Sequence, residues 1–202
     1  VECLFNNDWE EELQNLLIKL KTEGKIPSDN VTSGDNFFQC ITFKNNICEK
    51  TCPIIRKIFY GNNSVNTYEK NDYIVMKKNI KNLFNNNDMG KILNINNYIY
   101  KIELNEPFDI KCDIKTEKNT DRKYIEKDNN KIYIESNNIV YVKDNFFKPN
   151  YCRTVHSSQG LQYPIAIYIL DQYSSLNNIR MNYTACSRAK NKLYLLGKRG
   201  AF

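Results

Sequence analysis

The sequence predicts an α/β fold that is interrupted by a small, barrel-like, all-β insertion. Strand-like apolar runs alternate with helical patterns near both ends of the chain, as in a sheet covered by helices on both faces. Between them, short runs of alternating apolar and polar residues indicate hairpins. We therefore expect the α/β part to comprise residues 1–67 and 145–202, and the insertion to comprise residues 68–144.

The most regular helical pattern lies between residues 8 and 21. Its apolar side chains recur at spacings of three and four: Trp9, Leu13, Leu16, Leu17 and Leu20. Asp8 is a suitable N-cap, acidic residues fill the first turn, and Gly24 marks the end. We predict an amphipathic helix whose Trp and Leu stripe faces the core.

A strand and a second helix are predicted next. Residues 37–43 form a strand-like run, and residues 44–46 form a polar turn. Apolar residues from Ile47 to Ile58 then follow a helical spacing, in which Pro53 either bends the helix or marks its first turn. A strand, a polar turn and a helix in this order are one half of a βαβ unit.

The insertion shows a different periodicity. We predict a strand at residues 72–76, a turn at 86–90, a strand or hairpin at 91–104, and a hairpin at 131–143 around 136–138. Residues 107–131 are charged and weakly patterned. The α/β pattern then resumes, with strands at 165–170 and 192–197 and a helix at about 176–189.

Composition restricts the function only loosely. The formal net charge of +6 favours a nucleic-acid partner weakly, because the charges are spread along the chain. The 7 cysteines lack paired spacing, so we expect free thiols, no metal site, and an intracellular reducing compartment such as the cytoplasm, the nucleus or a viral factory rather than secretion. No apolar stretch is long enough to cross a bilayer, so we expect no membrane partner.

Two polar blocks near the C-terminus contain the candidate functional residues. The first, Thr154 to Gly160, holds the only histidine, His156, and leads into the strand predicted at 165–170. Hydroxyls and backbone amides around a tight turn suit phosphate oxygens of a nucleotide or a nucleic-acid backbone. Gly160 would allow close approach of the backbone. The alternative is a turn that is hydrogen-bonded for structural reasons alone. Without a Gly-x-Ser-x-Gly elbow, the pattern does not favour a hydrolytic triad.

The second block, Tyr183 to Lys190, places Arg188 after a helical face of small residues. A guanidinium group at the end of such a helix can form a fork of hydrogen bonds to a phosphate. The alternative is an arginine that caps the C-terminus of its own helix.

In this order, the two blocks resemble those of superfamily 1 helicases of the RecD and UvrD type. Thr154-Val-His-Ser-Ser-Gln-Gly160 resembles motif V, and Tyr183-Thr-Ala-Cys-Ser-Arg-Ala-Lys190 resembles motif VI. Residues 71–90 resemble a segment of RecD-type members, and residues 40–46 resemble motif IV. Asn87 stands where the family often has Gly, and Asn is the natural substitute at positive φ. Gln162 stands where the family often has Glu.

The resemblance implies the second, C-terminal RecA-like motor domain of an ATP-dependent DNA or RNA helicase or translocase. It implies that Arg188 is the catalytic arginine finger, which contacts the γ-phosphate, and that Gly160 and Gln162 approach the nucleotide. Four residues would contact single-stranded DNA or RNA: Thr42, Thr154, His156 and Ser157.

The signatures of the first motor domain are missing from this sequence. It has neither a P-loop nor an Asp-Glu pair after an apolar strand that could hold Mg²⁺. We therefore expect this chain alone not to hydrolyse ATP, and expect an N-terminal RecA-like domain before Val1 in a longer protein to complete the site for ATP and Mg²⁺. Two other hypotheses stay open: a non-catalytic nucleic-acid-binding module, and a scaffold that has lost its activity.

Overall fold

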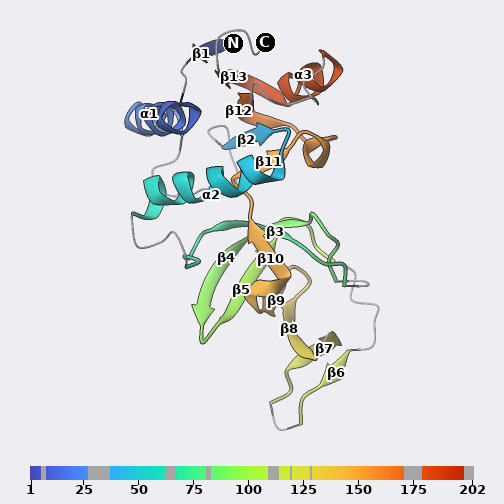
Figure 1. Cartoon of the computed structure of the whole chain (residues 1–202). Coiled ribbons are helices and arrows are strands. Elements are labelled where there is room, and N and C mark those ends of the chain that lie inside the picture. The colour runs from blue at the N-terminus through green and yellow to red at the C-terminus, as the bar shows by residue number, and fades with distance from the viewer. Residues whose placement is uncertain are drawn as a thin grey trace. The chain divides into compact units, whose positions relative to one another are not determined.

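The computed structural model describes residues 1–5, 8–26, 37–61, 67–80, 83–108, 114–118, 120–127, 129–170 and 179–197. The chain forms two compact units (Figure 1). The first consists of Val1–Thr67 and Tyr151–Phe202, and the second of Tyr68–Asn150. No helix in the described ranges is long and apolar enough to cross a membrane.

The first unit is built on a parallel sheet. Its order is β1 (Glu2–Phe5), β13 (Ala189–Gly197), β12 (Tyr163–Leu170), β2 (Phe38–Thr42) and β11 (Cys152–Thr154). All four pairs of neighbouring strands are parallel. The apolar residues of β12 are buried almost without interruption, as expected for a strand covered on both faces. The predicted α/β class with a parallel sheet is therefore confirmed.

Helices cover both faces of this sheet: α1 (Trp9–Thr22) and α2 (Asn45–Tyr60) on one, and α3 (Ile179–Cys186) on the other (Figure 1). Phe38 of β2 stacks on Phe59 of α2, with ring centroids 5.9 Å apart. On the opposite face, the Tyr168 hydroxyl donates to Asn182 Oδ1 of α3 at 2.7 Å. Tyr168 is the register partner of Ile41, so the two side chains lie on the same face of the sheet. Ile41 is three residues after Phe38 on β2, so Phe38 lies on the opposite face.

The first helix begins and ends as predicted. Asp8 accepts hydrogen bonds from the amides of Glu10 at 2.9 Å and Glu11 at 3.3 Å, and Gly24 adopts a φ of 66° just after the C-cap. Four leucines of the predicted stripe are buried, and Trp9 is half-buried.

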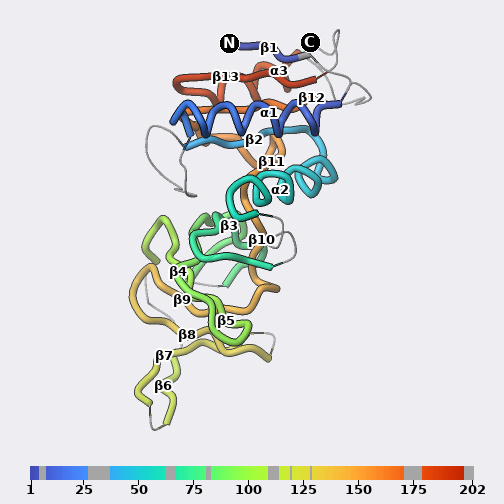
Figure 2. Tube along the Cα trace, turned by 90° about the vertical axis from the view of Figure 1, so that its left-hand side faces the viewer, coloured from blue at the N-terminus to red at the C-terminus, as the bar shows by residue number. Residues whose placement is uncertain are grey.

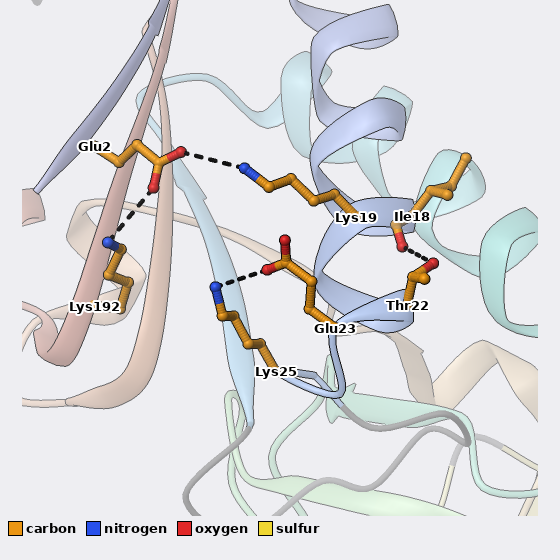
Figure 3. Close-up of polar contacts among 7 residues, drawn as sticks. All are labelled: Glu2, Ile18, Lys19, Thr22, Glu23, Lys25 and Lys192. Atoms are coloured by element: carbon orange, nitrogen blue, oxygen red, sulfur yellow. Dashed lines mark hydrogen bonds and ion pairs between the residues drawn. The ribbon is translucent and has the colours of Figure 1, made fainter.

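Exposed charges also join α1 to the edge of the sheet (Figure 3). Glu2 of β1 lies 3.8 Å from Lys19 Nζ of α1 and 3.5 Å from Lys192 Nζ of β13. A hydrogen bond from Lys25 lowers the pKa of the Glu23 carboxyl group. Solvent screens such pairs, so buried leucines hold the helix in place more than these contacts do.

Several boundaries in the first unit differ from the predictions. Asn45 already starts α2, so the predicted turn is mostly helical, and Pro53 lies inside the helix. Among described residues α3 ends at Cys186, short of the predicted 189, because Ala189 starts β13 by pairing with Tyr163. Residues 176–178 of that predicted helix lie outside the described ranges. The short strands β1 and β11 were not predicted, because three or four residues are too few to show the alternation of apolar and polar side chains.

The second unit is an antiparallel sheet. Its order is β10 (Phe147–Pro149), β3 (Tyr73–Met76), β4 (Met89–Asn96), β5 (Ile99–Leu104), β9 (Ile139–Val142), β8 (Asn130–Ser136), β7 (Lys123–Lys127) and β6 (Lys115–Thr116). Figure 2 follows these hairpins along the trace. The described strands pair in an open order, so the barrel-like closure we expected is not found among them. One end is β6, whose two residues are exposed.

Asparagine supplies several tight turns of this unit. Asn97 and Tyr98 both have positive φ, 47° and 63°, in the two-residue turn between β4 and β5. Asn87 has a φ of 78°, which confirms the conformation predicted for it. The weakly patterned residues 107–131 include β6 and β7 in their described part.

The return to the first unit differs from the predicted position at residue 145. A 3₁₀ helix at Asp144–Phe146 leads into β10, which pairs with β3 of the second sheet. Residues up to Asn150 therefore belong to the second unit in the structure.

Candidate functional site

The first polar block connects opposite edges of the parallel sheet. β11 ends at Thr154, in register with Thr42, the last residue of β2. β12 begins at Tyr163, and its Ile165 pairs with Phe38, the first residue of β2. Residues 155–162 therefore lead from the carboxyl edge of the sheet to its amino edge. The two ends of the block can contact different ligands.

At the carboxyl edge, Thr154 and Ser157 hold each other. Thr154 Oγ1 donates to Ser157 Oγ at 3.1 Å, and Ser157 Oγ donates to the Thr154 carbonyl oxygen at 3.0 Å. The Ser157 amide also donates to Thr154 Oγ1 at 3.3 Å, at the 3₁₀ helix His156–Ser158. Both hydroxyls are therefore engaged within the turn, whereas the His156 side chain is exposed. A hydroxyl of this pair could donate to a phosphate only by giving up an internal bond.

Thr42 contacts the first block through its main chain, and its side chain is not exposed to a ligand. It is 1% exposed, and its hydroxyl has no hydrogen-bond partner in the structure. Its carbonyl oxygen accepts from the Val155 amide at 2.8 Å. The surface contact expected for the Thr42 side chain is therefore not available in this conformation. The turn after it exposes Asn45 and Asn46 in the first turn of α2.

At the amino edge, Arg188 joins the second polar block to the residues that directly follow the first block. Its Nη1 donates to the Leu161 carbonyl oxygen at 3.1 Å, and the Arg188 carbonyl oxygen accepts from the Tyr163 amide at 2.8 Å. Its Nε donates to the Thr184 carbonyl oxygen at 3.0 Å, and its Nη2 to Ser187 Oγ at 2.8 Å. The guanidinium group thus caps α3, as the structural alternative expected, and also contacts Leu161, the residue after the first block.

Gly160 and Gln162 flank the carbonyl group that Arg188 contacts. Gly160 is exposed with a φ of 80°, and a Cβ built there would meet no atom within 4 Å, so its backbone is open to a ligand. Gln162 is exposed too. The structure therefore brings together the three residues that we predicted to bind nucleotide. Leu161 and Ser187 were missed, because main-chain acceptors and a small hydroxyl leave no signal in a sequence.

Two arginine side chains act on the Tyr163 phenol at this edge. Burial raises the pKa of the Tyr163 phenol, and the Arg153 and Arg188 guanidinium groups oppose that shift. The phenol is therefore neutral at pH 7. Among the described side chains, no group of three or more His, Cys, Asp or Glu residues is placed to hold a metal ion.

The fold and these connections define an α/β domain built on a parallel sheet, with candidate ligand contacts at both edges of that sheet. Residues 149–196 match the family model of the UvrD-like helicase C-terminal domain. The matched segment contains both polar blocks, and the match confirms the predicted resemblance to superfamily 1 helicases. No curated protein matches the sequence.

Solved structures that match this chain include several Pif1 helicases. The Bacteroides Pif1 helicase in complex with ADP-AlF3 and ssDNA is 14% identical with a TM-score of 0.49, over 94% of this chain and 49% of that one. The Candida albicans Pif1 helicase is 10% identical with a TM-score of 0.44, over 92% and 53%. The chain thus spans about half the length of these proteins.

Proposed function

We propose that this chain is the C-terminal motor domain of an ATP-dependent helicase or translocase that acts on single-stranded DNA. The observation that carries the proposal is the position of Arg188, whose guanidinium group bonds the Leu161 carbonyl between Gly160 and Gln162. A cation with several N–H donors beside an open glycine backbone suits the phosphates of a nucleotide. The family match of residues 149–196 supports the same function.

ATP would be held between this edge and an N-terminal RecA-like domain of the same protein. Arg188 would keep its bonds within the domain, direct the remaining N–H donors of Nη1 and Nη2 to the γ-phosphate, and stabilise charge that develops during phosphoryl transfer. Gly160 would let the backbone approach, and Gln162 would offer an amide to the ribose. The described residues of this chain offer no carboxylate cluster for Mg²⁺, so we assign that ion to the other domain.

The single-stranded DNA would be contacted at the opposite, carboxyl edge of the sheet. His156 is exposed there, next to the Thr154–Ser157 turn, and is the side chain most accessible to a phosphate or a base. Residues 155–162 link the two edges. A movement of the backbone at the nucleotide would therefore be transmitted along eight consecutive residues to the DNA-binding edge. The free cysteines of the described part are compatible with a reducing intracellular compartment, which we propose as the location.

The decisive experiment uses Arg188→Ala in the protein that includes the N-terminal motor domain. We expect the DNA-stimulated ATPase rate to fall by about 10³-fold or more, because an arginine finger contributes on that scale. The affinity for single-stranded DNA should stay nearly unchanged, because Arg188 lies at the other edge. Arg180→Ala is the matched control: it removes the same charge from an exposed position of α3 and should leave both quantities unchanged.

Arg188→Lys tests whether loss of activity in Arg188→Ala results from misfolding. It keeps the charge and one donor to the Leu161 carbonyl, yet cannot form the fork, so the ATPase should still be lost. Retention of DNA-stimulated ATPase activity by both Arg188 variants would overturn the proposal. Salt-sensitive DNA binding that is indifferent to ATP would then favour the non-catalytic binding module instead.

A further inference from the structure

Four cysteines lie in one layer of the first unit. Cys40 of β2 and Cys152 of β11 are register partners on adjacent parallel strands, so their side chains leave the sheet on the same face. Cys48 and Cys52 are four residues apart on α2 and share one side of that helix. Since α2 packs against both strands, all four thiols lie between the helix and the sheet.

Within this layer, Cys48 and Cys152 are in direct contact. The thiols of these two residues share a hydrogen bond. The sulfur of Cys52 lies instead against the backbone of Tyr151 and Cys152. Contact between two thiols from different elements is the geometric precondition for a disulfide, which needs its two Cβ atoms only a few ångströms apart.

The four thiols differ in their access to solvent. Cys48 is half-buried, whereas Cys40, Cys52 and Cys152 are buried. Burial raises the pKa of the Cys40 and Cys152 thiols well above the ordinary value, and that of Cys52 to about 12. The thiolate is the reactive form, so these three react slowly with an oxidant from solution. An oxidant therefore meets Cys48 first, with Cys152 as its contact partner.

We propose that Cys48 and Cys152 are a modification site that forms a reversible disulfide when the protein meets a peroxide. The Cys48 sulfur attacks one peroxide oxygen: an S–O bond forms and the O–O bond breaks. The other oxygen leaves as water, and Cys48 becomes a sulfenic acid. The Cys152 sulfur then attacks the Cys48 sulfur: the S–S bond forms, the S–O bond of the sulfenic acid breaks, and the hydroxide takes the Cys152 proton and leaves as a second water. Two thiols lose two electrons and two protons, and the peroxide is reduced to two waters.

The crosslink would tie α2 to β11 two residues before Thr154. It would also close residues 48–152 into a covalent loop, which restricts the unfolded chain more than the folded one. The oxidised protein should therefore have a higher Tm than the reduced protein. Neither effect depends on nucleotide or DNA binding, so the test is independent of the function proposed above.

The test treats the 202-residue chain with hydrogen peroxide, blocks remaining thiols with N-ethylmaleimide, and maps unreduced peptides by mass spectrometry. We expect a peptide pair linked through Cys48 and Cys152 that disappears with dithiothreitol, together with a rise in Tm. Cys48→Ser should abolish both, while Cys3→Ser, at an exposed cysteine of β1, should abolish neither.

Three results would overturn the proposal. One is conversion of Cys48 to sulfinic or sulfonic acid without any link. Another is a link from Cys48 to Cys40 or Cys52 in place of Cys152. The last is zinc bound in stoichiometric amount that protects the four thiols from the peroxide, which would make the cluster a metal site. If Cys48→Ser failed to fold by circular dichroism, the peptide map of the unmodified sequence would still decide.

Discussion

At the scale of single residues, Arg188 combines a structural and a functional position. Its Nε caps α3 through the Thr184 carbonyl, and its Nη1 reaches the Leu161 carbonyl, 27 residues away in sequence. Such bonds hold the guanidinium group in one place before any ligand arrives. A preorganised charge loses less conformational entropy on binding a phosphate than a free side chain does.

Removal of these bonds should be measurable without any ligand. We expect Arg188→Ala to lower the free energy of unfolding by about 1 to 3 kcal/mol, since charged hydrogen bonds are lost and the Leu161 carbonyl loses its partner. Arg188→Lys should cost less, because an ammonium group can still donate to one carbonyl. Urea titration of the 202-residue chain measures both values, with the exposed Arg180→Ala as control. Equal stability of Arg188→Ala and the control would contradict the bonding described here.

The sequence placed Arg188, Gly160 and Gln162 in one motif-based group, and they do lie together. It could not reveal that Thr42 is buried, because burial depends on how β11 and α2 cover the end of β2. Nor could it show that Thr154 and Ser157 bond each other, since the same hydroxyls in an open turn would face a ligand. Residue identity suggests a chemistry, and only tertiary contacts decide whether the group is free to perform it.

At the scale of elements, the N-terminal cap of α1 could be predicted from the local sequence alone. Asp8 accepts from the amides of Glu10 and Glu11. Asp8→Ala should lower stability by about 1 kcal/mol, because those amides lose their acceptor. Asp8→Asn keeps a side-chain oxygen and should cost only a few tenths of that. Urea unfolding followed by far-ultraviolet circular dichroism compares the two, and an equal loss for both would show that charge rather than capping matters.

Strand positions depend more on distant partners than helix caps do. The strand or hairpin at 91–104 and the hairpin at 131–143 were predicted because their apolar and polar residues alternate, and both are hairpins in the structure. β11 and β10 have only three residues each, and they are strands because β2 and β3 pair with them. Pairing of this kind is not encoded in local periodicity.

Gly90 of β4 illustrates how closely two strands approach. A Cβ at this position would lie 2.4 Å from the Glu103 carbonyl oxygen of β5. Gly90→Ala should therefore destabilise the second unit by about 3 kcal/mol, because a backbone atom in a hydrogen-bonded ladder cannot move aside cheaply. Lys91→Ala next to it loses only an exposed pair with Glu103 at 3.6 Å and should cost less than about 0.5 kcal/mol. Thermal unfolding of the two variants distinguishes packing from charge, and a harmless Gly90→Ala would contradict the close approach.

At the scale of the whole molecule, each unit has a hydrophobic core cluster of its own among the described residues. The first unit contains a cluster that includes Ile41, Tyr168 and Leu195, and the second contains a larger one around Ile102 and Phe147. Each cluster draws its buried residues from one unit. A unit with its own core satisfies the main physical condition for independent folding.

We therefore expect residues 68–150, produced alone, to fold. β3 and β10 are antiparallel neighbours, with Ile74 opposite Pro149, so the ends of the excised segment lie near each other and no strand loses its partner. The matched comparison is the segment 68–144, which ends where the sequence alone placed the boundary. It lacks β10 together with Phe146 and Phe147, both 0% exposed, and their loss should cost more than such a small core can supply. Dispersed amide signals and cooperative melting of 68–150, with neither for 68–144, would establish β10 as part of this unit. Equal folding of both segments would show that the boundary at 144 is the correct one.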